Sequence, residues 1–233
     1  MAQIHKLSRR DFLKASGMTA ISMALAACAP AQVNTEAPVA NANEALQRLL
    51  EGNQRYAANK SIDLNESQGR RAEVTSGQSP FATIFSCVDS RVPPELIFDR
   101  GLGDLFVIRT AGQVLDNAVL GSLQFGVAEL KIPLLVVLGH EKCGAVKATV
   151  EAMENNAIAE AEINWLVDGI RPAVEVAKGQ SGDLLDNAVK ANVSLTVEHL
   201  KGSSILSEAV ENGELRILGA RYDLDTGLVE VIG

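Results

Sequence analysis

The chain has 233 residues, of which 47% are hydrophobic, 21% charged and 4% aromatic, and its formal net charge is −8. This size and composition predict one globular domain whose core consists mostly of aliphatic side chains. The acidic charge argues against a nucleic-acid-binding protein, which would need a basic surface. The three cysteines, Cys28, Cys87 and Cys143, are an odd number in different contexts, so they do not indicate a disulfide framework.

The N-terminus is typical of an export signal. Residues 8–14 have the sequence SRRDFLK and precede a mostly apolar segment, residues 15–27, which is too short to span a bilayer. The pair Arg9 and Arg10 in this setting resembles the twin-arginine export signal. The alternative, an amphipathic N-terminal helix, is disfavoured because residues 15–27 have no charged face.

The signal is followed by a sequence that resembles a bacterial lipobox. Cleavage before Cys28, in Leu-Ala-Ala-Cys, would free this residue for a lipid; the alternative is an ordinary cleavage site with an incidental cysteine. Residues 29–43 are rich in Ala, Pro and Asn and predict a flexible tether. We therefore expect a signal peptide with a lipobox over 1–28, a tether over 29–43 and a single domain over 44–233. The expected location is the periplasm or cell surface, with a lipid anchor at Cys28.

The domain shows short apolar segments that alternate with helical patterns. Pro172 is expected to kink or split one helix, and Ser204 to cap another. Continuous apolar strands between helices predict an α/β fold with a mainly parallel β-sheet flanked by helices. The expected strands are 81–86, 104–109, 132–138, 215–219 and 228–232, and the expected helices are 44–59, 116–130, 145–154, 159–178, 184–200 and 205–211.

Three candidate metal ligands follow two of these strands. Cys87 comes directly after the first expected strand, and His140 and Cys143 follow the third. In parallel sheets, ligands bind at the carboxyl ends of strands. Thiolate and imidazole are preferred zinc ligands, and two cysteines with one histidine form a known catalytic set. The structural alternative is a buried, inert cysteine and a hydrogen-bonded core histidine.

Both metal motifs together resemble the signature of the β-class carbonic anhydrases. The first is Cys87-x-Asp89-x-Arg91 and the second is His140-x-x-Cys143 between two glycines, and the similarity covers about residues 44–233. The resemblance implies a β-carbonic anhydrase-like fold with zinc bound by Cys87, His140 and Cys143. It also implies reversible hydration of CO2 to bicarbonate and a proton, by a homodimer or tetramer.

The resemblance assigns catalytic roles to Asp89 and Arg91. Arg91 would keep Asp89 ionised, and Asp89 would accept a hydrogen bond from the attacking group and orient it. The structural alternative is a salt bridge that holds a loop. In part of the family the aspartate instead binds zinc at low pH, and closure of the site by Asp89 on acidification is a hypothesis for this chain as well.

Three further residues match substrate-binding positions of the family. Gln78 would donate an amide hydrogen bond to the substrate, Phe106 would form an aromatic wall that is often supplied across a dimer interface, and the N–H of Gly144 would face the site. The alternatives are a solvated turn for Gln78 and a core phenylalanine for Phe106. Ile84 and Ser86 stand where one branch of the family has the Trp and Gly of a bicarbonate inhibitor site, so we expect no such site.

Other functions remain compatible with the same residues. Zinc-dependent hydrolysis of a related small electrophile such as carbon disulfide would keep the metal and change the substrate. A non-catalytic zinc-binding surface lipoprotein would keep the metal alone. A thiol redox protein would need Cys87 and Cys143 to pair, but the chain has no Cys-x-x-Cys motif. The intact pair Asp89 and Arg91, together with Gln78, favours CO2.

Overall fold

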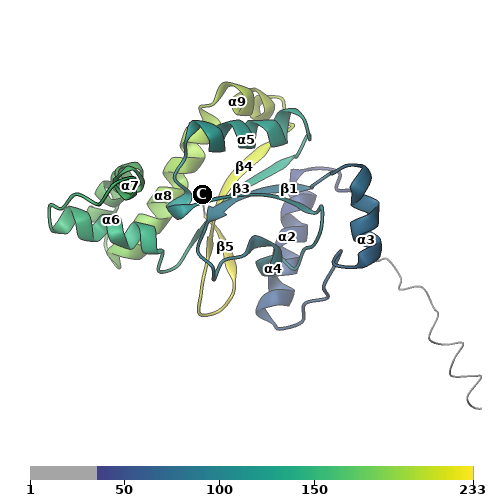
Figure 1. The fold of residues 1–233 in the computed structure, drawn as a ribbon, viewed down its shortest axis with the longest axis horizontal. Coiled ribbons are helices and arrows are strands. Elements are labelled where there is room, and N and C mark those ends of the chain that lie inside the picture. Colours follow the sequence, from purple (N-terminus) through teal and green to yellow (C-terminus); the bar gives the residue numbers. More distant parts are fainter. Residues whose placement is uncertain (1–35, 233) are drawn as a thin grey trace, which may run out of the picture. The chain divides into compact units, whose positions relative to one another are not determined.

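The computed structural model of this chain describes residues 36–232 (Figure 1). The predicted signal peptide, Cys28 and the first part of the predicted tether lie outside these residues. No helix in the described range is long and apolar enough to cross a membrane.

A five-stranded sheet with the order β2-β1-β3-β4-β5 forms the centre of the domain. Strands β1 to β4 are parallel, and β5 runs antiparallel to β4 at one edge. This confirms the predicted mainly parallel sheet. The strands are β1 Ala82–Cys87, β2 Leu105–Thr110, β3 Leu134–His140, β4 Arg216–Tyr222 and β5 Val229–Ile232.

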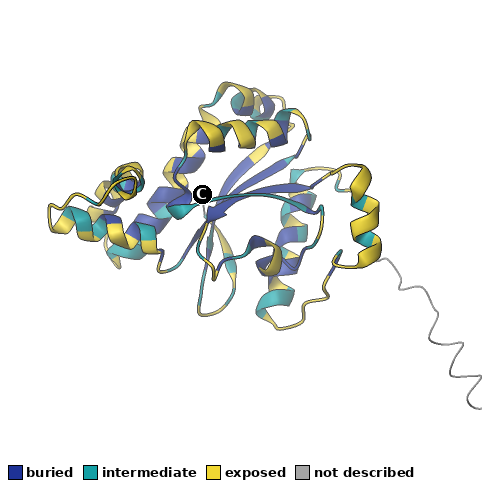
Figure 2. Ribbon diagram, in the orientation of Figure 1, coloured by how far each residue is buried: buried dark blue, intermediate teal, exposed yellow. Residues whose placement is uncertain are grey.

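Helices cover both faces of the sheet (Figure 1). The α-helices are α2 Ala42–Ala57, α3 Gln68–Glu73, α4 Pro94–Ile97, α5 Asn117–Ala128, α6 Gly144–Glu154, α7 Ile163–Lys178, α8 Leu184–Lys201 and α9 Ser204–Glu211. Two short 3-10 helices are η2 Val74–Ser76 and η3 Ala111–Gln113. The inner strands β1 and β3 are buried along their whole length, the edge strand β2 is half-buried, and the outer faces of the helices are exposed, as Figure 2 shows.

The continuous apolar sequence of the inner strands follows from this double cover. In β1, Ile84 packs in one hydrophobic cluster with Leu49 of α2 and Ile97 of α4. The next residue, Phe85, points to the opposite face and packs with Leu123 of α5 and other apolar side chains of α8 and α9. Because successive side chains of a strand alternate between faces, a strand covered on both sides favours apolar residues at most of its positions.

Several predicted boundaries differ from the structure. Strands β1 and β3 continue through Cys87 and His140, because both residues still pair with a neighbouring strand, at Thr110 and Tyr222 respectively. Helices α3 and α4 were not predicted. Helix α7 begins at Ile163 rather than 159 and continues through Pro172 to Lys178 without being split.

The predicted cap of α9 is wrong by one residue. Ser203, with an extended backbone, occupies the N-cap position, and Ser204 is the first helical residue. The carbonyl of Ser203 accepts the first helical hydrogen bond, from the N–H of Ser207 at 2.7 Å.

The described end of the predicted tether lies against the domain. The Glu36 carboxylate accepts a hydrogen bond from Arg100 Nη1 at 2.6 Å, and the Ala37 carbonyl accepts one from Arg48 Nη2 at 2.8 Å. Asn41 then caps helix α2 by accepting hydrogen bonds from two backbone N–H groups. Residues 36–43 are therefore part of the folded unit, and a tether over 29–35 stays a prediction.

Candidate metal centre

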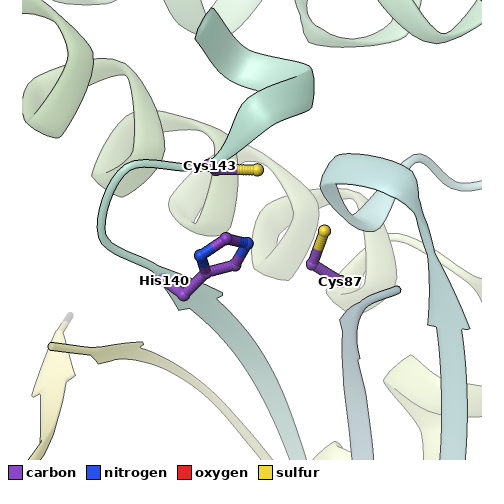
Figure 3. Close-up of side chains that lie close together, drawn as sticks. All are labelled: Cys87, His140 and Cys143. Carbon is purple, nitrogen blue, oxygen red and sulfur yellow. The ribbon is translucent and has the colours of Figure 1, made fainter. Parts of the chain in front are cut away.

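Cys87, His140 and Cys143 converge at the carboxyl ends of two adjacent strands (Figure 3). Cys87 ends β1, His140 ends the neighbouring β3, and Cys143 is the N-cap residue of α6. One ligand atom from each residue lies within 4.8 Å of the other two. The three residues are buried, with exposed fractions of 4%, 0% and 1%. The prediction that they meet at one point is confirmed.

A tight turn after β3 brings the second and third of these residues together. The N–H of Glu141 donates to the carbonyl of Tyr222 at 2.9 Å, so the chain follows the neighbouring strand to this point. Lys142 then adopts a left-handed backbone conformation with φ of 53°, which reverses the chain. As a result, the Cys143 side chain faces His140 from the start of α6 (Figure 3).

The imidazole of His140 is oriented for metal binding. Its Nδ1 lies 2.9 Å from the carbonyl oxygen of Glu141, and a carbonyl can only accept, so Nδ1 carries the proton. Nε2 therefore presents a lone pair. This buried nitrogen has no hydrogen-bond partner in the described part of the chain. Since an unpaired buried polar atom is costly, it fits a position that a metal ion completes.

The two thiols would provide negative charge to a zinc ion by losing their protons when the metal binds. A hydrogen bond from the Cys143 thiol lowers the pKa of Cys87, against the effect of burial, and the backbone N–H of Gly112 adds to this lowering. The same contact with Cys87, together with burial, raises the pKa of Cys143. In a tetrahedral zinc site with bonds of about 2.0–2.3 Å, ligand atoms lie roughly 3.3–3.8 Å apart, which the observed cluster accommodates.

Asp89 and Arg91 form an ion pair beside these ligands. Arg91 Nε and Nη2 donate to the two carboxylate oxygens of Asp89 at 3.0 and 2.7 Å. This hydrogen bonding lowers the pKa of Asp89 to about 2, so the carboxylate is ionised at neutral pH. Its Oδ2 lies 3.8 Å from His140 Nε2, which is too far for a hydrogen bond but adjacent to the metal position.

Arg109 holds the segment that carries both Cys87 and Asp89. The sequence alone predicted no role for this arginine. Its Nε donates to the carbonyl of Cys87 at 2.9 Å and its Nη2 donates to the carbonyl of Asp89 at 2.8 Å. Its position as a charged residue near the end of the otherwise apolar strand β2 could have indicated a structural role. Both contacts stabilise the conformation that turns Asp89 toward the metal position.

Gly144 is the first residue of α6 and directly follows a metal ligand. A Cβ atom built on this residue would meet no atom within 4 Å, so its backbone borders open space.

Gln78 and Phe106 lie away from the metal centre of the same chain. Gln78 is exposed in the loop before β1. Phe106 pairs with Thr83, four residues before Cys87 in β1, which corresponds to roughly 13 Å along the strand. The Phe106 ring is half-buried and packs against Phe125, with 6.5 Å between ring centroids. One protomer does not bring these two residues to the metal ligands.

Comparison with known proteins identifies the family. The sequence profile described as carbonic anhydrase matches residues 82–229. Carbonic anhydrase 2 of Mycobacterium tuberculosis is 41% identical over 191 residues, which cover 82% of this chain and 92% of the relative. A carbonic anhydrase of Mycolicibacterium smegmatis is 39% identical over 195 residues, covering 83% of this chain and 95% of the relative.

The chain belongs to the β-class carbonic anhydrases. The solved structure of a β-carbonic anhydrase from Coccomyxa in complex with acetazolamide matches with a TM-score of 0.64 and 28% identity, covering 80% of this chain and 86% of that one. The predicted fold is thereby confirmed. This family consists of zinc-dependent lyases, and this carbonic anhydrase is accordingly a zinc enzyme.

The export signal is confirmed separately. A profile of the twin-arginine translocation signal matches residues 6–26, so the enzyme is exported across a membrane.

Proposed function

We propose that the enzyme converts CO2 and water reversibly to bicarbonate and a proton, with Cys87, His140 and Cys143 as its zinc ligands. The observation that carries this proposal is the buried, unpaired Nε2 of His140 facing two thiols beside the Asp89–Arg91 ion pair. Zinc held by these three residues would act as a Lewis acid that lowers the pKa of water and so provides a nucleophile near neutral pH.

Asp89 orients the attacking oxygen in this proposal. The carboxylate is ionised and acts only as a hydrogen-bond acceptor, so it accepts a hydrogen bond from the nucleophile and turns an oxygen lone pair toward the carbon of CO2. Arg91 binds both carboxylate oxygens and also receives support from the Lys142 carbonyl, which accepts from its Nη2 at 3.5 Å. This clamp keeps Asp89 from rotating away from the substrate.

We further propose that a second copy of the chain completes the substrate pocket. Gln78 and Phe106 cannot serve the metal centre of their own protomer, yet Gln78 is exposed and Phe106 lies on β2, an edge strand. In a homodimer, the amide of Gln78 would donate to bicarbonate and the ring of Phe106 would exclude water, while the N–H of Gly144 would be contributed by the first copy. A dimer is then the smallest active unit, and a tetramer would contain two such units.

The site of action proposed here is the periplasm or cell surface. Cleavage of the signal before Cys28 would allow lipid attachment, and residues 29–35 would link the anchor to the folded unit. In labelling with a radioactive fatty acid, the chain should become labelled and membrane-bound, while Cys28→Ala should be unlabelled. An exported, unlabelled wild-type chain would instead indicate a soluble periplasmic enzyme.

Stopped-flow measurement of CO2 hydration tests the reaction, with zinc counted on the same sample of exported enzyme. We expect about one zinc per subunit and rapid hydration, both lost in Cys143→Ala. Zinc without hydration at neutral and at alkaline pH would contradict the proposal. Turnover of carbon disulfide by that sample would then indicate the other electrophile, and no turnover of either would indicate a non-catalytic zinc protein.

The thiol redox alternative makes a different prediction. It leaves the unpaired Nε2 of His140 without a role, and it requires Cys87 and Cys143 to form a disulfide. Counting free thiols before and after zinc is removed by a chelator separates the two functions. The metal site predicts two thiols that become reactive only after chelation.

A further inference from the structure

The short helix η3 contributes a backbone group to the metal centre. Gly112 in this helix donates its N–H to Sγ of Cys87 at 3.3 Å. Gly112 and Gln113 both adopt left-handed backbone conformations, with φ of 63° and 52°. A non-glycine residue such as Gln113 rarely adopts this conformation, so neighbouring groups must hold the turn in place.

Two buried amide side chains hold it. Asn192 of α8 donates from Nδ2 to the carbonyl of Gly112 at 2.7 Å, and the same group lies 3.5 Å from Gln113 Oε1. Gln113 donates from Nε2 to the carbonyl of Leu138 in β3 at 2.7 Å. Asn192 and Gln113 are 6% and 3% exposed. These hydrogen bonds connect α8, η3 and β3 in one buried network.

Neighbouring helices pack closely against the turn. A Cβ atom on Gly112 would lie 2.6 Å from Cδ1 of Ile170 in α7 and 3.1 Å from Cβ of Ala145 in α6. Gly112 therefore packs closely between helices α6 and α7. Asn192 holds the peptide group between Gly112 and Gln113, and Gln113 ties the turn to β3, so together they limit the backbone rotations that would move the Gly112 N–H.

We propose that Asn192 and Gln113 are positioning residues that aim the Gly112 N–H at the Cys87 thiolate and thereby tune the metal centre. This inference rests on the proposed zinc ligands. An N–H···S hydrogen bond draws electron density from the thiolate, so Cys87 donates less charge to the metal and the metal remains a stronger Lewis acid. The effect matters at this centre because two thiolates would otherwise cancel the charge of the ion.

The test replaces Asn192 by an apolar residue of similar size, Asn192→Leu, in the full exported enzyme. The matched control is Asn187→Leu on the same helix, whose Nδ2 donates to the Ser181 carbonyl at 3.1 Å near the surface. The readouts are zinc affinity, from competition with a chelator, and the sulfur-to-metal charge-transfer band after replacement of zinc by cobalt(II). Circular dichroism establishes that each variant is folded.

We expect Asn192→Leu to weaken zinc binding by about 10-fold, because residues that orient metal ligands typically contribute this much. We also expect its charge-transfer band to move to longer wavelength, because the thiolate becomes a stronger donor. Asn187→Leu should change neither quantity. If Asn192→Leu does not fold, Gln113→Met takes its place with the same two readouts.

A folded variant with unchanged zinc affinity and an unmoved band would overturn the inference, since Asn192 would then serve only the stability of the fold. Failure of the proposed zinc site is distinguishable from this outcome. In that case the parent enzyme itself binds no zinc, and the inference falls together with the ligand set.

Discussion

The two ends of the central strands differ in how completely one protomer forms a site there. At the carboxyl ends of β1 and β3, Cys87, His140 and Cys143 are buried and face one another, with Asp89 beside them. Near the opposite end, Gln78 is exposed in the loop that precedes β1. This difference supports the proposal that one chain completes the metal centre but not the substrate pocket.

This division has a physical reason. Zinc binding requires three ligand atoms placed to within a fraction of an ångström, which neighbouring strands and a tight turn of one chain provide. CO2 is small and neutral, and contacts with it need less precise placement than metal ligands. In the proposed dimer, a second molecule can therefore supply these contacts. Variants at each end should therefore fail in different ways.

The largest effect is expected at the carboxyl end. Cys87→Ser should lose zinc and reduce CO2 hydration to the uncatalysed rate, because a neutral hydroxyl replaces a thiolate ligand. Phe106→Leu, near the other end of the sheet, should keep its full zinc content. Zinc counting by atomic emission, together with stopped-flow hydration, measures both. Equal zinc loss in the two variants would contradict the claim that only residues at the carboxyl ends of the strands hold the metal.

Removal of the orienting carboxylate should have the next largest effect. Asp89→Asn should keep zinc but hydrate CO2 roughly 100-fold more slowly, since an amide can donate instead of accepting and no longer orients the nucleophile. The control is Asp168→Asn, which disrupts an exposed ion pair with Arg171 on α7. Its activity should equal that of the parent, and zinc loss in Asp89→Asn would instead show a structural role for this carboxylate.

A smaller effect is expected at the opposite end, and it tests the dimer directly. Gln78→Ala should keep zinc and lose about 10-fold in activity, the order of one lost hydrogen bond to a charged group. Co-refolding this variant with inactive Cys143→Ala should restore activity, because a mixed dimer combines one intact zinc site with one intact Gln78. No recovery in mixed dimers would show that Gln78 serves its own protomer or none.

The smallest effect concerns stability rather than catalysis. Asp186 of α8 binds Arg221 Nε at 2.7 Å and Lys190 Nζ at 2.9 Å. Burial alone would raise the pKa of Asp186, but the hydrogen bond from Lys190 and the charge of Arg221 outweigh it and lower this pKa. A lowered pKa adds stability above the unfolded value of about 3.9 and loses it as the pH falls through the folded value.

Asp186→Asn should therefore reduce the free energy of unfolding at pH 7 by about 1 kcal/mol and should flatten its decline in acid. Urea unfolding at pH 7 and pH 3 measures this difference. The zinc content and activity of the folded variant should match those of the parent, which separates stability of the fold from construction of the metal centre.

Much of this enzyme follows from local sequence patterns. The apolar segments predicted all five strands to within a few residues, most directly β1 and β3, which are buried at every position because helices cover both faces. The motifs around Cys87, His140 and Cys143 predicted the metal centre, since the carboxyl ends of adjacent parallel strands meet at one edge. The ion pair of Asp89 and Arg91 was predicted from the resemblance to the β-class carbonic anhydrases, and the structure contains it.

Tertiary structure alone decided the contacts between distant segments. Nothing near Gly112 in the sequence indicates that its N–H reaches Cys87, or that Asn192, 80 residues later, holds its carbonyl. Likewise, only the pairing register of β1 and β2 shows that Phe106 lies far from the metal centre of its own chain. Local patterns determine which elements form and which face is buried, whereas packing of those elements determines which backbone groups and distant side chains meet.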